Sequence, residues 1–151
     1  MALSNQYCTF HLDQFFFGIE VQKVQEVLRF QEMTRVPLAP PVVEGLINLR
    51  GQIVTAIELR RRLELQPRPD GQLPMNVVVR TEDGPVSLLV DEIGDVLEMD
   101  DDSFERPPET LRGIARELIR GAYKLKDRLL LTLDIEKTVS INANDTMRSN
   151  A

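Results

Sequence analysis

The strongest constraint on the fold of this chain is an internal duplication. Residues 18–28 resemble residues 87–97 at a shift of 69 positions, and residues 45–63 resemble residues 121–139 at a shift of 76. Apolar and polar positions largely coincide in both comparisons. Segments that recur in the same order encode the same structural unit twice. The shift grows by seven residues between the two comparisons, which predicts an inserted loop within residues 98–120.

Short strand signals make up both halves. Residues 7–12 alternate between polar and apolar side chains, and residues 15–21 form an apolar, aromatic run after a two-residue interruption. This pattern is typical of a β-hairpin. Residues 76–80 and 86–90 repeat the hairpin in the second half around a turn that contains Gly84. The two units are therefore predicted to begin in the same way.

More strands follow the first hairpin. Residues 45–51 and 53–59 are predicted to be two strands joined by a turn at Arg50-Gly51. Residues 24–28 place apolar side chains at three- and four-residue spacing, which fits either one helical turn or a twisted strand. Each half thus offers about five short strands in roughly 60 residues, the content of a small closed or partly closed β-barrel.

A proline-rich segment marks the predicted boundary between the units. Residues 66–74 hold three prolines and a glycine, which favours a semi-rigid connector. A unit of this size buries only about 60% of the surface of its unfolded chain, so we expect the two barrels to pack through an apolar seam beside a groove for a partner. Whether the barrels exchange strands stays open. The predicted organisation is a first β-barrel at 6–66, a connector at 67–75, a second β-barrel at 76–141 and a flexible tail at 142–151.

The acidic balance of the chain limits its partners. With 18 Lys and Arg against 24 Asp and Glu, the formal net charge is −6, which disfavours nucleic acid and anionic membrane surfaces. No stretch approaches the roughly 18 apolar residues of a membrane helix, and the N-terminal residues lack the features of a signal peptide. Membrane insertion is therefore not expected. The single cysteine, Cys8, suits a reducing cytoplasm.

Residues that catalysis or metal binding would need are scarce. The single histidine, His11, lies three residues from Cys8 in one predicted strand, so the two side chains point to opposite faces and cannot pair. No zinc-protease, P-loop or dinucleotide-binding motif occurs, and one His with one Cys cannot build a structural zinc site. Two groups of neighbouring carboxylates, Asp91 with Glu92 and residues 100–102, are interpreted as solvated loop charges. No enzyme activity, cofactor or metal is predicted.

Two charged residues lie where a partner could meet the protein. Arg50 is at a glycine turn, where its planar guanidinium could bind a carboxylate of a partner, brace the groove, or do neither. Glu26 lies between Val24 and Val27 and could be a solvated charge or a specificity contact on an apolar rim. The class that fits these features best is an interaction protein.

Several motifs taken together resemble one known family. In the first half they are residues 18–27, residues 34–37 and residues 45–54, and in the second half residues 90–97 and residues 127–137. Any one of these motifs alone would be weak, but their combined order is specific. Over nearly its whole length, from about Tyr7 to Ile141, the chain resembles the CheW family of chemotaxis coupling proteins.

The resemblance implies an all-β fold of two tandem five-stranded SH3-like or OB-like β-barrels with short helices. It implies a non-catalytic, cytoplasmic scaffold that is recruited to membrane-associated arrays and holds chemoreceptors to the histidine kinase CheA. The cleft between the barrels would receive the helical hairpin tip of the receptor, and a barrel edge would dock on the regulatory domain of CheA. Carried over by motif position, the receptor-binding candidates are Val24, Glu26 and Val96, and the cleft-shaping candidates are Gly45 and Arg50.

Two other functions remain as alternatives. A CheW-like adaptor of another chemosensory pathway, such as one that governs pili or surface behaviour, would carry similar receptor-facing motifs. A small ligand-binding barrel or an enzyme that uses the cleft between the barrels is the alternative from a different class, and the scarcity of catalytic groups disfavours it.

Overall fold

The computed structural model describes residues 4–141, and the predicted tail at 142–151 lies outside the described residues. Eleven β-strands alternate with five short helical segments along this part of the chain. The strands are β1 (Ser4–Leu12), β2 (Phe15–Glu20), β3 (Val24–Leu28), β4 (Val43–Leu49), β5 (Gln52–Glu58), β6 (Met75–Thr81), β7 (Gly84–Val90), β8 (Glu92–Asp100), β9 (Phe104–Glu105), β10 (Ile119–Lys124) and β11 (Leu129–Leu133). The helical segments are η1 (Val21–Lys23), α1 (Leu59–Arg62), η2 (Asp101–Ser103), α2 (Gly113–Leu118) and α3 (Ile135–Val139).

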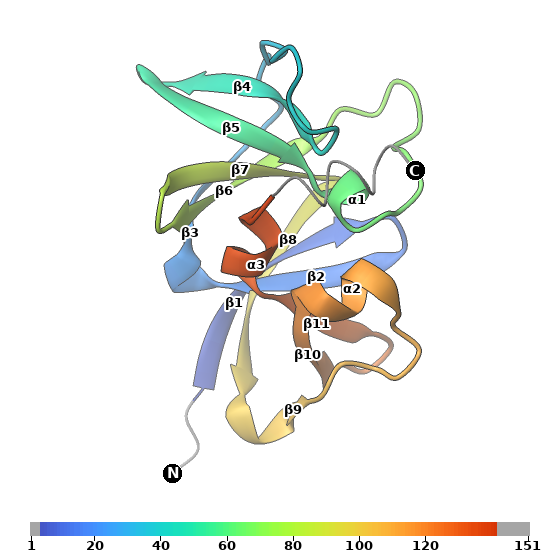
Figure 1. Ribbon diagram of the computed structural model, residues 1–151. Helices are drawn as coiled ribbons and strands as arrows, with labels where there is room; N and C mark the ends of the chain where they lie inside the picture. The colour runs from blue at the N-terminus through green and yellow to red at the C-terminus, as the bar shows by residue number, and fades with distance from the viewer. Residues whose placement is uncertain (1–3, 142–151) are drawn as a thin grey trace.

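The strands form two sheets, one above the other in Figure 1. The lower sheet has six strands in the order β8-β1-β2-β11-β10-β9, and the upper sheet has five in the order β3-β6-β7-β5-β4. The predicted all-β class is confirmed. The expectation of five strands in each unit is corrected, because the inserted segment between β8 and β10 contributes the short additional strand β9.

The predicted hairpins are present. β1 pairs with β2, β6 with β7, and β4 with β5, all antiparallel. Arg50 and Gly51 form the turn between β4 and β5 with φ values of 51° and 89°, and this left-handed pair suits the right-handed twist of a hairpin. Residues 24–28, which fitted either a helical turn or a strand, form the strand β3, and the single helical turn η1 directly precedes them.

Each sheet combines strands from both halves of the chain. In the six-stranded sheet, β2 of the first half pairs in parallel with β11 of the second. In the five-stranded sheet, β5 of the first half pairs in parallel with β7 of the second. Each hairpin is thus completed by strands of the other half, which answers the open question about strand exchange. The predicted units at 6–66 and 76–141 therefore describe the repeat along the sequence, whereas the sheets cut across it.

The strand registers reproduce the duplication in detail. Thr55 lies opposite Val86 in the upper sheet. In the repeat, Thr55 corresponds to Leu131 at the shift of 76, and Val86 corresponds to Phe17 at the shift of 69. Leu131 and Phe17 lie opposite each other in the lower sheet. The irregularities of pairing recur as well: the β3·β6 and β1·β8 pairs shift register at corresponding places, as do the β4·β5 and β10·β11 pairs. The repeat therefore encodes the pairing partners as well as the strands.

An apolar cluster shared by both sheets fills the space between them. Phe10 and Phe17 of the β1–β2 hairpin lie in one buried cluster with Val79 and Leu88 of the β6–β7 hairpin. Phe16, the neighbour of Phe17, points the opposite way, into a separate cluster on the other face of the lower sheet. The first hairpin is thus buried on both faces, which explains its uninterrupted aromatic run.

The two short helices that close the repeats are also joined. The side chain of Arg62 in α1 is buried, and its Nε donates a hydrogen bond to the carbonyl oxygen of Thr138 in α3 at 2.8 Å. Its Nη2 donates to the carbonyl oxygen of Lys137 at 2.9 Å. These bonds tie α1 to the carbonyl groups at the C-terminal end of α3, of which that of Lys137 also accepts a hydrogen bond from the Ser140 N–H.

Two glycines in equivalent strands allow another segment to cross closely. A Cβ atom at Gly45 in β4 would lie 2.7 Å from the carbonyl oxygen of Thr34, and Thr34 forms an isolated bridge with Leu46. A Cβ atom at Gly121 in β10 would overlap the carbonyl oxygen of Glu105 in β9. At both places only glycine leaves room for the crossing backbone.

Replacing Gly121 with alanine should lower the free energy of unfolding by about 1–3 kcal/mol, because the added methyl group forces β9 away from β10. Urea unfolding followed by circular dichroism measures the change. Lys126→Ala, in the exposed turn of the same hairpin, is the control and should change stability by less than about 0.5 kcal/mol. Equal stability of Gly121→Ala and wild type would show that β9 yields without cost.

Candidate functional site

An ion pair joins two of the predicted site residues. Glu26 lies on the edge strand β3, and its carboxylate accepts a hydrogen bond from Nη2 of Arg50 in the β4–β5 turn. This bond lowers the pKa of Glu26 and raises the pKa of Arg50. The side chain of Arg50 is 69% exposed and that of Glu26 22% exposed, so the guanidinium remains accessible to a partner.

Local backbone geometry sets the position of Arg50. The side-chain oxygen of Asn48 accepts a hydrogen bond of 2.8 Å from the backbone N–H of Gly51, which closes the turn around Arg50. The turn residues between two paired strands leave little freedom at the Arg50 backbone. Arg50 is therefore presented from a rigid hairpin end.

The other first-half candidates lie in the same five-stranded sheet as this pair. Val24 begins β3 opposite Val79 of β6 and packs, half-buried, against the shared apolar cluster. Arg80 donates hydrogen bonds to the carbonyl oxygens of Gln22 and Val24, at 3.0 and 2.8 Å. Gly45 lies within β4, the opposite edge strand of this sheet, where it makes room for Thr34.

The last candidate, Val96, lies on the other sheet. It is part of the edge strand β8 and is 56% exposed. Its equivalent in the duplication, Val27 of β3, is 44% exposed and follows Glu26 directly. Sequence reasoning placed Val27 beside Glu26 without proposing it as a site residue, although the alignment of the two repeats pairs it with Val96. The structure thus groups Val24, Glu26 and Arg50 on one sheet and leaves Val96 on the edge of the other.

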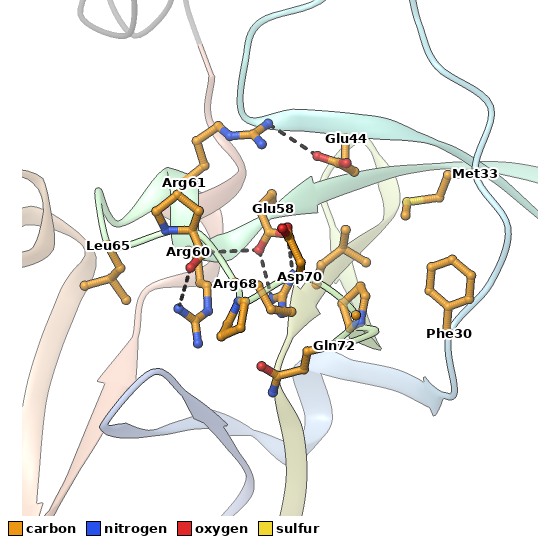
Figure 2. Close-up of a pocket in the computed structure, with 15 residues that line it drawn as sticks. Phe30, Met33, Glu44, Glu58, Arg60, Arg61, Leu65, Arg68, Asp70 and Gln72 are labelled. Atoms are coloured by element: carbon orange, nitrogen blue, oxygen red, sulfur yellow. Dashed lines mark hydrogen bonds and ion pairs between the residues drawn. The ribbon is translucent and has the colours of Figure 1, made fainter.

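A cavity of about 470 Å³ opens at a different place, beside the connector (Figure 2). The connector bounds it on one side, and the end of β5 with α1 bounds it on another. None of the five predicted site residues lines it. Its lining residues are Phe30, Met33, Glu44, Glu58, Arg60, Arg61, Leu65, Pro67, Arg68, Pro69, Asp70, Gly71, Gln72, Pro74 and Leu89.

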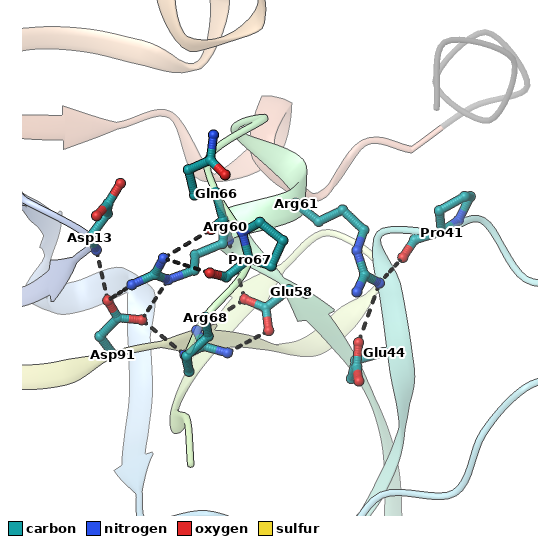
Figure 3. Close-up of polar contacts among 10 residues, drawn as sticks. All are labelled: Asp13, Pro41, Glu44, Glu58, Arg60, Arg61, Gln66, Pro67, Arg68 and Asp91. Atoms are coloured by element: carbon teal, nitrogen blue, oxygen red, sulfur yellow. Dashed lines mark hydrogen bonds and ion pairs between the residues drawn. The ribbon is translucent and has the colours of Figure 1, made fainter. Parts of the chain in front are cut away.

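A buried network of four charged side chains forms the base of this region (Figure 3). Arg60 of α1 binds Asp91 with two hydrogen bonds, Nε to Oδ1 at 3.0 Å and Nη2 to Oδ2 at 2.6 Å. Arg68 of the connector donates to Asp91 Oδ1 at 2.9 Å and to both carboxylate oxygens of Glu58, at 2.6 and 3.0 Å. Two positive and two negative charges therefore balance one another in a largely buried position.

The network corrects the sequence interpretation of Asp91. The Asp91-Glu92 pair was expected to be solvated, but Asp91 is only 7% exposed, whereas Glu92 is exposed. Burial disfavours the charged form of Asp91, and hydrogen bonds from Arg60, the Asp13 backbone and Arg68 outweigh it, so its pKa lies below the ordinary value. The partners lie 23 to 78 residues away, which is why no local pattern predicts them.

This network ties the connector to both halves. Glu58 ends β5, Arg68 lies within the connector, and Asp91 joins β7 to β8. Arg60 also donates to the carbonyl oxygen of Gln66, at 2.9 Å. The segment predicted as a spacer is therefore anchored through a buried arginine.

The single histidine lies half-buried beside an aromatic ring that also contacts the exposed Arg128. The ring of His11 lies 4.9 Å from that of Phe16, and the guanidinium of Arg128 lies 3.8 Å from the centre of the same ring. Within residues 4–141, no group of three or more His, Cys, Asp or Glu side chains is arranged to hold a metal ion. No helix of that part of the chain is long and apolar enough to cross a bilayer.

Removing Asp91, which accepts hydrogen bonds from both arginines of the network, should destabilise the fold strongly. Asp91→Ala leaves Arg60 buried without its carboxylate partner, and we expect the free energy of unfolding to fall by about 3–5 kcal/mol. Urea unfolding measures the loss. The exposed neighbour Glu92 is the matched control, and Glu92→Ala should cost less than about 0.5 kcal/mol. Similar losses for both variants would contradict a structural role for the network.

Stability should also depend on pH through Asp91. Because its pKa is lower in the folded chain than the ordinary 3.8, the folded state binds fewer protons than the unfolded state near that pH. The contribution of Asp91 is complete above the unfolded pKa and is lost as the pH falls through the folded pKa. The stability difference between wild type and Asp91→Asn, measured by urea unfolding from pH 7 to pH 3, should therefore shrink below about pH 4. A difference that does not change with pH would contradict this assignment.

Comparison with known proteins gives one consistent family. Residues 6–142 match the family described as CheW-like domain. The chain is 32% identical to the chemotaxis protein CheW of Treponema pallidum over 139 residues, covering 89% of this chain and 82% of the relative. It is 30% identical to CheW of Klebsiella aerogenes, covering 92% and 84%. The crystal structure of the scaffolding protein TtCheW from Thermoanaerobacter tengcongensis superposes with a TM-score of 0.83 at 26% identity, covering 93% of this chain and 95% of that one.

Proposed function

Because this chain belongs to the CheW family, we propose that it is a scaffold that couples chemoreceptors to the histidine kinase CheA. In this proposal the protein binds the helical hairpin tip of the receptor at one surface and the regulatory domain of CheA at another. It acts in the cytoplasm at membrane-associated receptor arrays. Signals pass through the position of the bound partners, without a chemical step on the scaffold.

The observation that carries the proposal is the Glu26–Arg50 ion pair, which joins the edge strand β3 to the exposed β4–β5 turn. Glu26 follows the half-buried Val24 by two residues, and the exposed Val27 comes next in β3, so charged and apolar side chains share this edge strand. Surfaces of this composition suit a helix that offers apolar anchors with charged side chains next to them. Fixing Arg50 in a rigid turn keeps the entropic cost of binding low.

The duplicated fold supports binding of two different partners. Val27 and Val96 are exposed at equivalent positions on two separate edge strands, β3 and β8. Two edges on one rigid body can be occupied at the same time, as a coupling protein requires. The names of the relatives, which include a scaffolding protein, also support a role without catalysis.

The direct test is assembly of a ternary complex. The protein is mixed with a CheA regulatory domain and with a receptor cytoplasmic fragment, separately and together, and the species are separated by size-exclusion chromatography with light scattering. We expect both binary complexes and a ternary complex of their summed mass. If the two partners compete for the scaffold, the proposal of simultaneous binding is wrong.

Glu26→Lys should weaken binding of the receptor fragment by roughly 1–3 kcal/mol, because it reverses a charge and breaks the pair with Arg50. Isothermal titration calorimetry measures the change. Glu136→Lys, an exposed charge reversal on α3, is the matched control and should bind normally. Unchanged binding by Glu26→Lys would remove Glu26 from the receptor site.

A double variant separates direct contact from positioning. Glu26→Lys combined with Arg50→Glu restores an ion pair of reversed polarity at the same place. If Glu26 itself contacts the receptor, the double variant should stay weak. Recovery of binding would show instead that the pair acts by holding the β4–β5 turn in place.

A further inference from the structure

We propose that a second copy of this chain is a binding partner, through reciprocal exchange of halves. In the exchanged dimer, the first half of each copy would pair with the second half of the other, and the connector would run between two complete folds. This proposal concerns self-association and does not depend on the proposed function.

The strand pairing makes such an exchange possible. The first half, β1–β5, and the second half, β6–β11, are joined by four strand pairs: β1 with β8, β2 with β11, β3 with β6 and β5 with β7. The shared apolar cluster adds contacts between the same two halves. The chain itself passes from one half to the other once, at residues 66–74. The second half of another copy can therefore make the same contacts with the first half of this chain, and no new binding surface is needed.

The buried network limits where the chain can open. Arg68 binds Glu58 of its own half, and Arg60 holds the carbonyl oxygen of Gln66. These contacts lie on the first-half side of the connector, so they survive an exchange, and Asp91 of the second copy can replace Asp91 of the first. The hinge is thereby confined to residues 69–74. Extended as a polyproline-like segment, these six residues span roughly 19 Å.

One turn within the hinge keeps the chain closed on itself. The N–H of Gln72 donates a hydrogen bond of 3.2 Å to the carbonyl oxygen of Pro69, and Gly71 has a φ of 86°. Pro69 and Pro74 favour extended backbone on either side of this turn. The single chain thus needs a left-handed glycine in a segment whose other residues favour extension, and an exchanged dimer does not need it.

Gly71 allows a test that touches only this turn. No atom lies within 4 Å of a Cβ built at Gly71, so a substitution strains the backbone conformation without removing a contact. Each exchanged dimer contains two opened hinges, so the backbone strain of a substituted Gly71 is relieved twice in the free energy of dimerisation. For Gly71→Ala we expect the dimer dissociation constant to fall roughly 30-fold or more. Gly71→Pro, which cannot adopt a positive φ, should have a larger effect.

The first measurement is the dimer fraction after refolding. The full chain is unfolded in urea, refolded at about 1 to 200 μM, and analysed by size-exclusion chromatography with light scattering. Gly84→Ala is the matched control, since Gly84 also has a positive φ and no atom within 4 Å of a built Cβ, but lies in a hairpin that is the same in monomer and dimer. Gly84→Ala should lower stability and leave the dimer fraction unchanged. Absence of a dimer in every variant, or equal dimer fractions for Gly71→Ala and Gly84→Ala, would overturn the proposal.

The second measurement distinguishes exchange from surface association. Cys8 of β1 lies directly opposite Val96 of β8, and directly opposed residues of antiparallel strands are close enough for a disulfide after Val96→Cys. In a monomer this disulfide links one chain to itself. In an exchanged dimer it links two chains, because β1 and β8 then come from different copies. The isolated dimer should therefore run as a covalent dimer on a non-reducing denaturing gel, and a monomer band from that fraction would contradict exchange.

Discussion

Packing of the β1–β2 hairpin against the β6–β7 hairpin is the interaction on which the rest of this structure depends. Phe10 and Phe17 share one buried cluster with Val79 and Leu88, and this cluster lies between the two sheets. Neither hairpin completes its own half: each is joined in parallel to a strand of the other half. The sheets and the interface between them therefore form together, and the two repeats make one folding unit although the sequence reads as two.

Local pattern predicted the hairpins and the repeat, because alternation and turn chemistry are properties of neighbouring residues. The Arg50-Gly51 turn is an example, since its positive φ values follow from its residue types. Pairing between halves was not predictable in this way, because the apolar run of β2 is the same whichever strand lies beside it. The burial of Asp91 likewise depends on Arg60 and Arg68, whose positions only the folded chain defines. The family resemblance identified both Glu26 and Arg50 as candidates. The ion pair between them became visible only in the folded structure.

The duplicated edges have diverged in chemistry while keeping their geometry. Glu26 and Arg50 form an ion pair in the five-stranded sheet, and the equivalent positions in the six-stranded sheet hold Asp95 and Lys126. Charge types are kept there, but no ion pair joins Asp95 to Lys126 in the described structure. The inserted segment between β8 and β10 adds β9 on that side only. A duplicated fold therefore presents two edges of different chemistry.

The exchange of hairpins also has a consequence for synthesis on the ribosome. When β1 to β5 have emerged, none of the strands that pair with them from the second half exists yet, so the nascent chain holds isolated hairpins and an unpaired β3. Two-stranded hairpins are marginal in water, and their apolar faces and open edges are prone to aggregation until the rest of the chain follows. During synthesis the five-stranded sheet therefore cannot be completed until β7 has left the exit tunnel, and the six-stranded sheet cannot be completed until β11 has left it.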